Sequence, residues 1–173
     1  MTKQELLIGK HPDNSHPYGK WLAANDLPDS YMKCHRELTE ITAVDDELIV
    51  WMAKKIINHH YTQFRISRLK EKYKSLGFAK YAEQHRKLPI TDKVKKGNAT
   101  EILLTDYIQA SQKKEFIKVY KLKYNPNVDQ AIKGDDTLMV DLFEENGNEK
   151  IKIYLGESKF RTTPQKNVVE DIT

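Results

Sequence analysis

The sequence has 173 residues, a formal net charge of +4, 31% charged residues and 39% apolar residues. This length suits one domain, or one domain with a sizeable N-terminal extension, and the composition permits a globular core. The longest apolar run, Leu48 to Ala53, is far too short to span a bilayer, and the first residues lack the apolar stretch of a signal peptide. Cys34 is the only cysteine, which excludes an intrachain disulfide, argues against a structural zinc site and fits a reducing cytoplasm.

Residues 1–90 are predicted to form an N-terminal region that starts irregularly and continues as basic helices. Prolines at positions 12, 17 and 28 indicate loops, with a short strand over residues 31–38. Residues 45–61 place acids in a first turn and basic groups toward the end, which favours a helix. Residues 64–87 are predicted to form one or two basic helices broken near Gly77. A boundary at Leu88-Pro89-Ile90 then separates this region from a second one, residues 91–173.

A basic block covers residues 65–96, where eleven Lys and Arg residues stand against three acids, a balance of +8. Such a block indicates a track for a polyanion, although a solvated helix face would look the same. Aromatic residues such as Phe64 and Phe78 lie among the cations and could stack on bases, but packing onto the domain is the favoured interpretation. The candidate nucleic-acid-binding residues are Arg65, Arg68, Lys70, Lys72, Arg86, Lys87, Lys95 and Lys96.

Residues 98–112 are predicted to form a helix in front of a sheet. Asn98 is a plausible N-cap, and Glu101 stands three residues later, as in a capping box. Glu101 therefore has two open interpretations, a helix cap or a carboxylate that supports a metal site. Leu104 and Ile108 share the face that would pack on the sheet. Residues 114–124 are rich in β-branched and aromatic side chains and are predicted to form the first strand.

The strongest local signal is a β-hairpin over residues 136–159 with Asn146-Gly147 at its turn. Asn-Gly tolerates the positive φ angles of a type I′ turn, which is typical of two-residue hairpin loops. The register then follows, and it places six aliphatic side chains on one side of the hairpin because side chains alternate along a strand. The facing pairs are Leu142 with Ile151, Val140 with Ile153, and Leu138 with Leu155.

The same register predicts that Asp136 and Glu157 face each other at the open end of the hairpin, with Lys159 on the same side. Two facing carboxylates are destabilising unless a cation lies between them, and an oxygen-lined pocket suits a hard ion such as Mg²⁺. The lysine adds a positive charge where a phosphate could bind. Ser158 is expected to point to the other face and to pack there. The alternative is a simple surface charge pair between Glu157 and Lys159.

The Asp136 and Glu157-Ser158-Lys159 pattern, with Glu101 on a preceding helix, resembles the signature of the PD-(D/E)xK, or restriction-endonuclease-like, superfamily. More narrowly, the stretch from Gly97 to Phe160 resembles the nuclease component of Hachiman antiphage defence, the Hachiman A family. The resemblance implies an α+β fold, namely a helix followed by a mixed sheet with a central hairpin, beside a mostly helical N-terminal region. It also implies that residues 91–173 are a nuclease core that is incomplete at its C-terminus.

The function implied by this resemblance is a cytoplasmic, Mg²⁺-dependent endonuclease, with Mn²⁺ as a possible substitute. Asp136, Glu157 and Glu101 would hold the metal, and Lys159 would act on the attacking water and the transition state. The expected partners are DNA and a helicase subunit, Hachiman B, with no membrane. The alternative is a non-catalytic module that binds nucleic acid or the helicase through residues 65–96.

Overall fold

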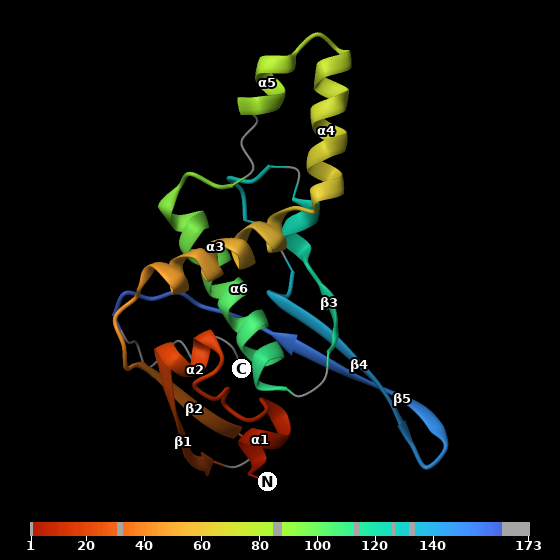
Figure 1. Ribbon diagram of the computed structural model, residues 1–173. Helices are drawn as coiled ribbons and strands as arrows, with labels where there is room; N and C mark the ends of the chain where they lie inside the picture. The colour runs from red at the N-terminus through yellow and green to blue at the C-terminus, as the bar shows by residue number, and fades with distance from the viewer. Residues whose placement is uncertain are drawn as a thin grey trace.

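The computed structural model describes residues 2–30, 33–84, 88–112, 115–125, 127–131 and 134–163 (Figure 1). Over these ranges the fold is α+β, with helices around two separate antiparallel sheets of two and three strands. The predicted α+β class is therefore confirmed. None of the described helices has the length and apolar character that crossing a membrane requires.

The N-terminal segment is more regular than the sequence predicts. It contains α1 (Lys3–Leu7), α2 (Pro17–Trp21), β1 (Leu22–Ser30) and β2 (Lys33–Glu40). The expected strand over residues 31–38 overlaps β2, but β1 was not predicted, and the prediction of an irregular start is wrong. The Asn, Asp and Pro residues of β1 have low strand propensity, so pairing with β2 decides the conformation of β1. Arg36 strengthens this pairing by donating two hydrogen bonds to Asp26, at 2.6 and 3.0 Å.

The predicted helices of the middle of the chain are present as α3 (Asp46–His60), α4 (Gln63–Ser75) and α5 (Ala79–Gln84). Asp45 caps α3 by accepting a hydrogen bond from the Leu48 amide at 2.8 Å. Gly77 has a φ of +82°, so the break between α4 and α5 uses the left-handed conformation that glycine tolerates. Figure 1 shows these two helices projecting away from the rest of the molecule.

Three of the four aromatic residues in this segment are exposed and Tyr73 is half-buried, so the prediction that they pack into the core is wrong for Phe64, Phe78 and Tyr81. Phe64 is 74% exposed, Phe78 60% and Tyr81 52%. The physical reason is that α4 and α5 pack mainly against each other, with the Tyr81 ring edge-on to the Tyr73 ring at 4.9 Å between ring centres. These rings therefore lie at the surface among the basic side chains.

The central helix α6 (Asp92–Ser111) begins six residues before the predicted start. Thr91 is its N-cap residue, so Asn98 and Glu101 lie inside the helix and the predicted capping box is wrong. Asn98 is buried and its amide contacts the His60 ring at 3.1 Å. A glycine at position 97 costs a helix only about 1 kcal/mol, which the packing of α6 against its neighbours outweighs.

The second sheet has the order β3-β4-β5, with β3 (Ile117–Val119), β4 (Thr137–Glu145) and β5 (Asn148–Gly156). The predicted hairpin is confirmed in register, and its turn residues have the positive φ angles expected, +54° and +75°. The predicted first strand is shorter than residues 114–124, because the chain turns into a 3₁₀ helix, η1 (Lys121–Tyr124). The three strands of this sheet pair antiparallel, so the predicted mixed sheet is not seen within the described ranges.

The two faces of this sheet differ in burial. Thr137, Met139 and Asp141 are between 0% and 3% exposed, and Thr137 meets Thr105 of α6 at 2.7 Å between hydroxyl oxygens. The opposite face carries the aliphatic side chains of the hairpin and is largely exposed. Its residues at least 45% exposed are Ile117, Val119, Leu142, Ile151, Ile153 and Leu155.

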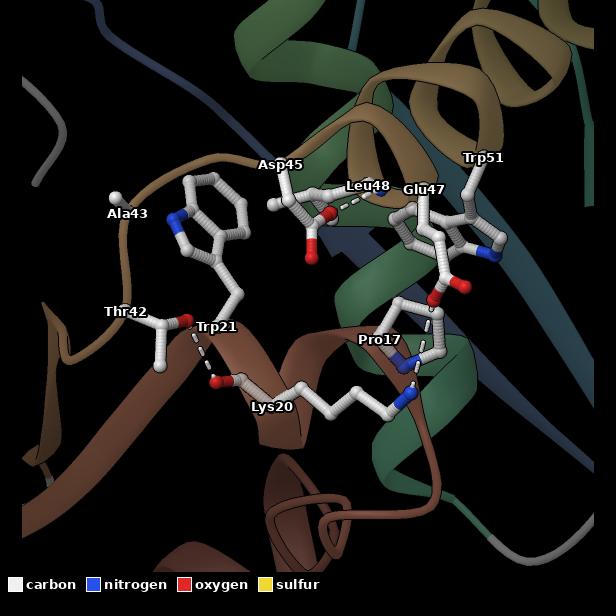
Figure 2. A pocket seen from close by; sticks show the side chains of 9 residues that line it. All are labelled: Pro17, Lys20, Trp21, Thr42, Ala43, Asp45, Glu47, Leu48 and Trp51. Carbon is white, nitrogen blue, oxygen red and sulfur yellow. Dashed lines mark hydrogen bonds and ion pairs between the residues drawn. The ribbon is translucent and has the colours of Figure 1, made fainter.

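A separate pocket lies where α2 approaches the start of α3 (Figure 2). Trp21 and Trp51 line it, and Lys20 spans it to reach Glu47 at 4.0 Å. The Thr42 hydroxyl donates a hydrogen bond to the Lys20 carbonyl at 2.9 Å. None of the acidic residues at the open end of the β4–β5 hairpin lines this pocket, so the pocket is distinct from that acidic cluster.

Candidate metal centre

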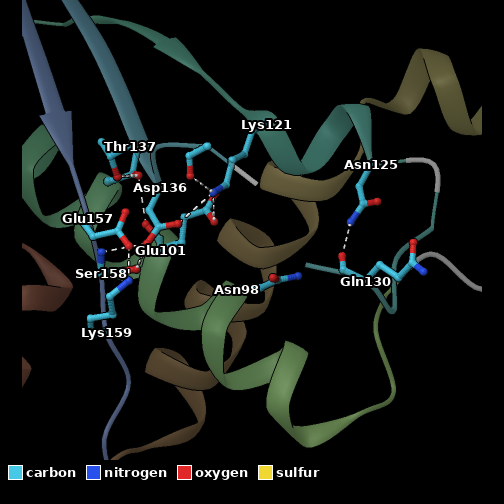
Figure 3. A network of polar contacts seen from close by, with 12 residues as sticks. Asn98, Glu101, Lys121, Asn125, Gln130, Asp136, Thr137, Glu157, Ser158 and Lys159 are labelled. Atoms are coloured by element: carbon cyan, nitrogen blue, oxygen red, sulfur yellow. Dashed lines mark hydrogen bonds and ion pairs between the residues drawn. The ribbon is translucent and has the colours of Figure 1, made fainter. Parts of the chain in front are cut away.

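The four candidate catalytic residues gather at the open end of the β4–β5 hairpin (Figure 3). Asp136 immediately precedes β4, and Glu157 and Lys159 follow β5. Glu101 approaches from the middle of α6 and is only 7% exposed. The structure therefore brings together residues that are up to 58 positions apart in the sequence.

Asp136 is held by hydrogen bonds from the other strand. Its amide donates to the Gly156 carbonyl at 3.0 Å, and its Oδ2 accepts from the Ser158 amide at 2.8 Å and the Ser158 hydroxyl at 2.7 Å. Ser158 thus points toward the site, and the prediction that it packs on the other face is wrong. The alternation of side chains stops at Gly156, where β5 ends, so it cannot be extended to residue 158.

Lys121, from η1, lies between Asp136 and Glu101. Its ammonium nitrogen is 2.8 Å from Asp136 Oδ1 and 3.2 Å from Glu101 Oε2. Burial by itself raises the pKa of Asp136, but the bonds from Lys121 and Ser158 outweigh it and hold that pKa below its usual range. Asp136 is therefore a carboxylate that stays charged well below neutral pH.

Glu101 has the opposite electrostatic character. Burial raises its pKa to about 7, Lys121 opposes this rise, and the charges of Asp136 and Glu157 add to it. At neutral pH Glu101 is thus divided between its protonated and charged forms.

Glu157 and Lys159 form an ion pair with each other at the more exposed side of the cluster. Their side chains are 37% and 35% exposed, so a ligand from solution can reach both. The three acids are therefore paired with two lysines, Glu101 and Asp136 with Lys121, and Glu157 with Lys159. This leaves one excess negative charge when all three acids are ionised.

The backbone around the acids allows little variation. A Cβ atom at Gly156 would lie 3.1 Å from a methyl of Leu104 and 3.1 Å from the Thr137 Cβ, so glycine lets the hairpin approach α6 closely. Gly134, two residues before Asp136, has a φ of +119°, which side chains rarely permit. The glycines that precede Asp136 and Glu157 thus have a geometric role in placing these two carboxylates.

The acids as they stand are closed around lysines. Asp136, Glu157 and Glu101 offer carboxylate oxygens, which are the kind of ligand that Mg²⁺ and Mn²⁺ prefer. In the part of the chain that the structure describes, no group of three His, Cys, Asp or Glu side chains is arranged to hold a metal ion. Binding a metal therefore requires the carboxylates to exchange their lysine partners for the ion.

The candidate nucleic-acid-binding residues lie in two places. Those on α4 are exposed except Arg65, which is half-buried and lies over the Tyr61 ring at 5.6 Å. Lys95 and Lys96, at the start of α6, are exposed, and Lys96 lies 5.5 Å from the Phe160 ring centre. Arg86 and Lys87 are outside the described residues. The exposed candidates on α4 are therefore Arg68, Lys70 and Lys72, and Lys74 on the same helix is exposed as well.

Lys121 is the site residue that sequence reasoning missed. It lies in the segment predicted as a regular strand, where its neighbours Lys118 and Lys123 are also lysines. The change from β3 to a 3₁₀ helix directs the Lys121 side chain toward the acids, and no local pattern in the sequence signals that change. Only the prediction of an acid pair that needs a nearby cation points to such a residue.

The raised pKa of Glu101 leads to a prediction about stability. A carboxyl whose pKa is raised by folding stabilises the protein while protonated, and that contribution is lost as the pH rises from 4.5 to about 7. Glu101→Gln has no carboxyl group at this position to ionise. The difference in unfolding free energy between the variant and the unchanged protein should therefore shift in favour of the variant by up to about 3 kcal/mol over this range. Chemical denaturation of both proteins at pH 4.5 and 8 measures this difference. Equal pH slopes for the two proteins would contradict it.

The fold and the site together define an α+β protein with a carboxylate–lysine cluster at the open end of a β-hairpin. The family model for HamA matches residues 16–173, so the chain belongs to the HamA family. It is 38% identical to the Hachiman protein HamA of Bacillus cereus over 174 residues, which cover 99% of this chain and 60% of that relative. The chain thus spans about 60% of the length of the curated relative that it matches. No solved structure matches the chain.

Proposed function

We propose that this protein is a metal-dependent nuclease that hydrolyses DNA phosphodiester bonds as part of Hachiman antiphage defence. The observation that carries the proposal is the convergence of Glu101, Asp136, Glu157 and Lys159 at one end of the sheet. Carboxylates beside a lysine suit phosphodiester hydrolysis, because the acids bind cations and the lysine stabilises negative charge on the phosphate. Membership of the HamA family supports the assignment to this defence system.

In the proposed mechanism Asp136 and Glu157 would hold the metal, with Glu101 as a third ligand. A Mg²⁺ or Mn²⁺ ion held there would supply Lewis acidity and activate water as the nucleophile. Ser158 fixes the orientation of the Asp136 carboxylate through its two hydrogen bonds. Lys159, exposed beside Glu157, orients the attacking water and stabilises the charge that develops on the phosphate oxygens.

The direct test is cleavage of plasmid and linear DNA by the purified protein, alone and together with the helicase that the Hachiman system pairs with it. We expect cutting in the presence of Mg²⁺ or Mn²⁺ and none in EDTA. We further propose that the helicase partner restrains or licenses this activity, and that the protein acts in the cytoplasm. Cleavage that is equally fast in EDTA would contradict the metal-dependent reaction.

The exposed basic face of α4 is proposed to bind the phosphate backbone of DNA. Replacing Arg68, Lys70 and Lys72 with Ala should weaken DNA binding and reduce the salt slope of log K by about 0.9 for each phosphate that is no longer neutralised. Fluorescence anisotropy at several salt concentrations measures this slope. A matched control replaces Lys3, Lys10 and Lys20, which lie in the N-terminal segment away from the projecting helices. Steeply salt-dependent binding without any metal-dependent cleavage would instead favour a non-catalytic binding module.

A further inference from the structure

Three oxygen atoms surround the ammonium group of Lys121. They are Asp136 Oδ1 at 2.8 Å, Glu101 Oε2 at 3.2 Å and the Gly134 carbonyl at 3.3 Å. An ammonium group has three donors and no acceptor, so these three oxygens satisfy it. The side chain of Lys121 is only 16% exposed, so its charge is largely shielded from solvent.

This environment is also the one that a hard divalent ion selects. The three groups that contact the Lys121 ammonium are oxygen atoms, and two of them belong to carboxylates. Mg²⁺ requires oxygens at about 2.0–2.1 Å, much closer than the oxygens around the ammonium. An ion and the ammonium group therefore cannot occupy this position together, and they compete for the same two carboxylates.

We propose that Lys121 is a built-in counter-ion that occupies the cation position between Glu101 and Asp136, and that a divalent ion displaces it on binding. This inference rests on the proposed metal site and describes what holds Glu101 and Asp136 close together when no metal is bound. The four-carbon stem of lysine lets the ammonium move away by rotation of side-chain bonds, without a change in the fold. Lys121 thereby keeps the two acids together in the metal-free protein and competes with the metal.

The test compares Mn²⁺ binding by the unchanged protein and by Lys121→Met, which keeps a long stem but removes the charge. The loss of the free Mn²⁺ signal in electron paramagnetic resonance measures binding without any need for activity. We expect Lys121→Met to bind Mn²⁺ at least about tenfold more tightly, because the competing charge is gone. Without metal it should melt at a lower temperature, since the two acids repel, and Mn²⁺ should raise its melting temperature more than that of the unchanged protein.

Lys123→Met is the matched control, because Lys123 belongs to the same 3₁₀ helix but its ammonium lies 3.8 Å from the Tyr120 ring centre. Its Mn²⁺ affinity should equal that of the unchanged protein. If Lys121→Met fails to fold, Lys121→Gln retains donors for the acids and should show the same gain in affinity. Mn²⁺ binding that is unchanged or weaker in the Lys121 variants overturns this inference and leaves the metal site standing. Absence of Mn²⁺ binding by every variant and by the unchanged protein overturns both proposals.

Discussion

Glu157→Gln is expected to slow metal-dependent DNA cleavage by on the order of 10²–10³-fold or more. The substitution preserves the size of the side chain and removes a charge that the proposed metal needs. Because Glu157 lies at the exposed side of the cluster, the variant should fold as well as the unchanged protein, within about 0.5 kcal/mol. Lys159→Ala should have a similar effect on cleavage, through loss of the positive charge beside the phosphate.

Glu149→Gln is the control for this prediction. Glu149 lies on the same strand, β5, but at its turn end, opposite Glu144 and far along the hairpin from the cluster. Cleavage by this variant should equal that of the unchanged protein. Gel assays of supercoiled plasmid at a fixed Mg²⁺ concentration give the rates, and thermal melting followed by circular dichroism reports folding. Normal cleavage by Glu157→Gln would remove Glu157 from the mechanism.

Met139→Ala should destabilise the protein by about 2–5 kcal/mol, the usual cost of a cavity in a packed core. Met139 is 0% exposed, on the face of β4 that packs toward α6. Leu142→Ala provides the comparison on the same strand, because Leu142 is 60% exposed on the opposite face and should cost less than about 1 kcal/mol. Denaturant unfolding of both variants measures these free energies. A larger loss for Leu142→Ala would mean that the hairpin packs with its other face inward.

The buried face of the hairpin could not be predicted from the sequence. The Asn146-Gly147 turn fixes the register, and the register predicted which residues share a face. Apolar content alone would place the aliphatic side of the hairpin in the core, yet the buried side contains Thr137, Met139 and Asp141. Packing against α6 decides the buried face, and a local pattern in the hairpin carries no information about its partner.

The buried face of α6 explains why this partner was hard to recognise. It consists largely of polar residues, and most of them contact a partner distant in sequence, so no apolar periodicity marks it. Asp106, for example, lies 3.4 Å from His59 and 3.5 Å from Lys55. Burial raises the pKa of Asp106, but the bond to His59 and the nearby positive charges outweigh it and lower that pKa overall.

The grouping of Asp136, Glu157 and Lys159 was predicted by extending the hairpin register past its last pair. The structure brings these residues to one end of the hairpin, but the strand pairing stops at Thr137 and Gly156, and Asp136 bonds to Ser158 instead of facing Glu157 in the ladder. Glu101 was recognised with two alternatives, and the start of α6 at Asp92 removes the helix-cap interpretation. Lys121 and the role of Ser158 depend on where β3 and β5 end, which local propensity does not determine.

The most direct measurement is the anomalous difference map of crystals of this protein soaked in Mn²⁺. We predict one or more Mn²⁺ peaks within about 2.2 Å of oxygens from both Asp136 and Glu157, with the Lys121 ammonium moved away from Glu101 and Asp136. Crystals that show no Mn²⁺ at this position, with Asp136 still bonded to Lys121 at saturating metal, would contradict it.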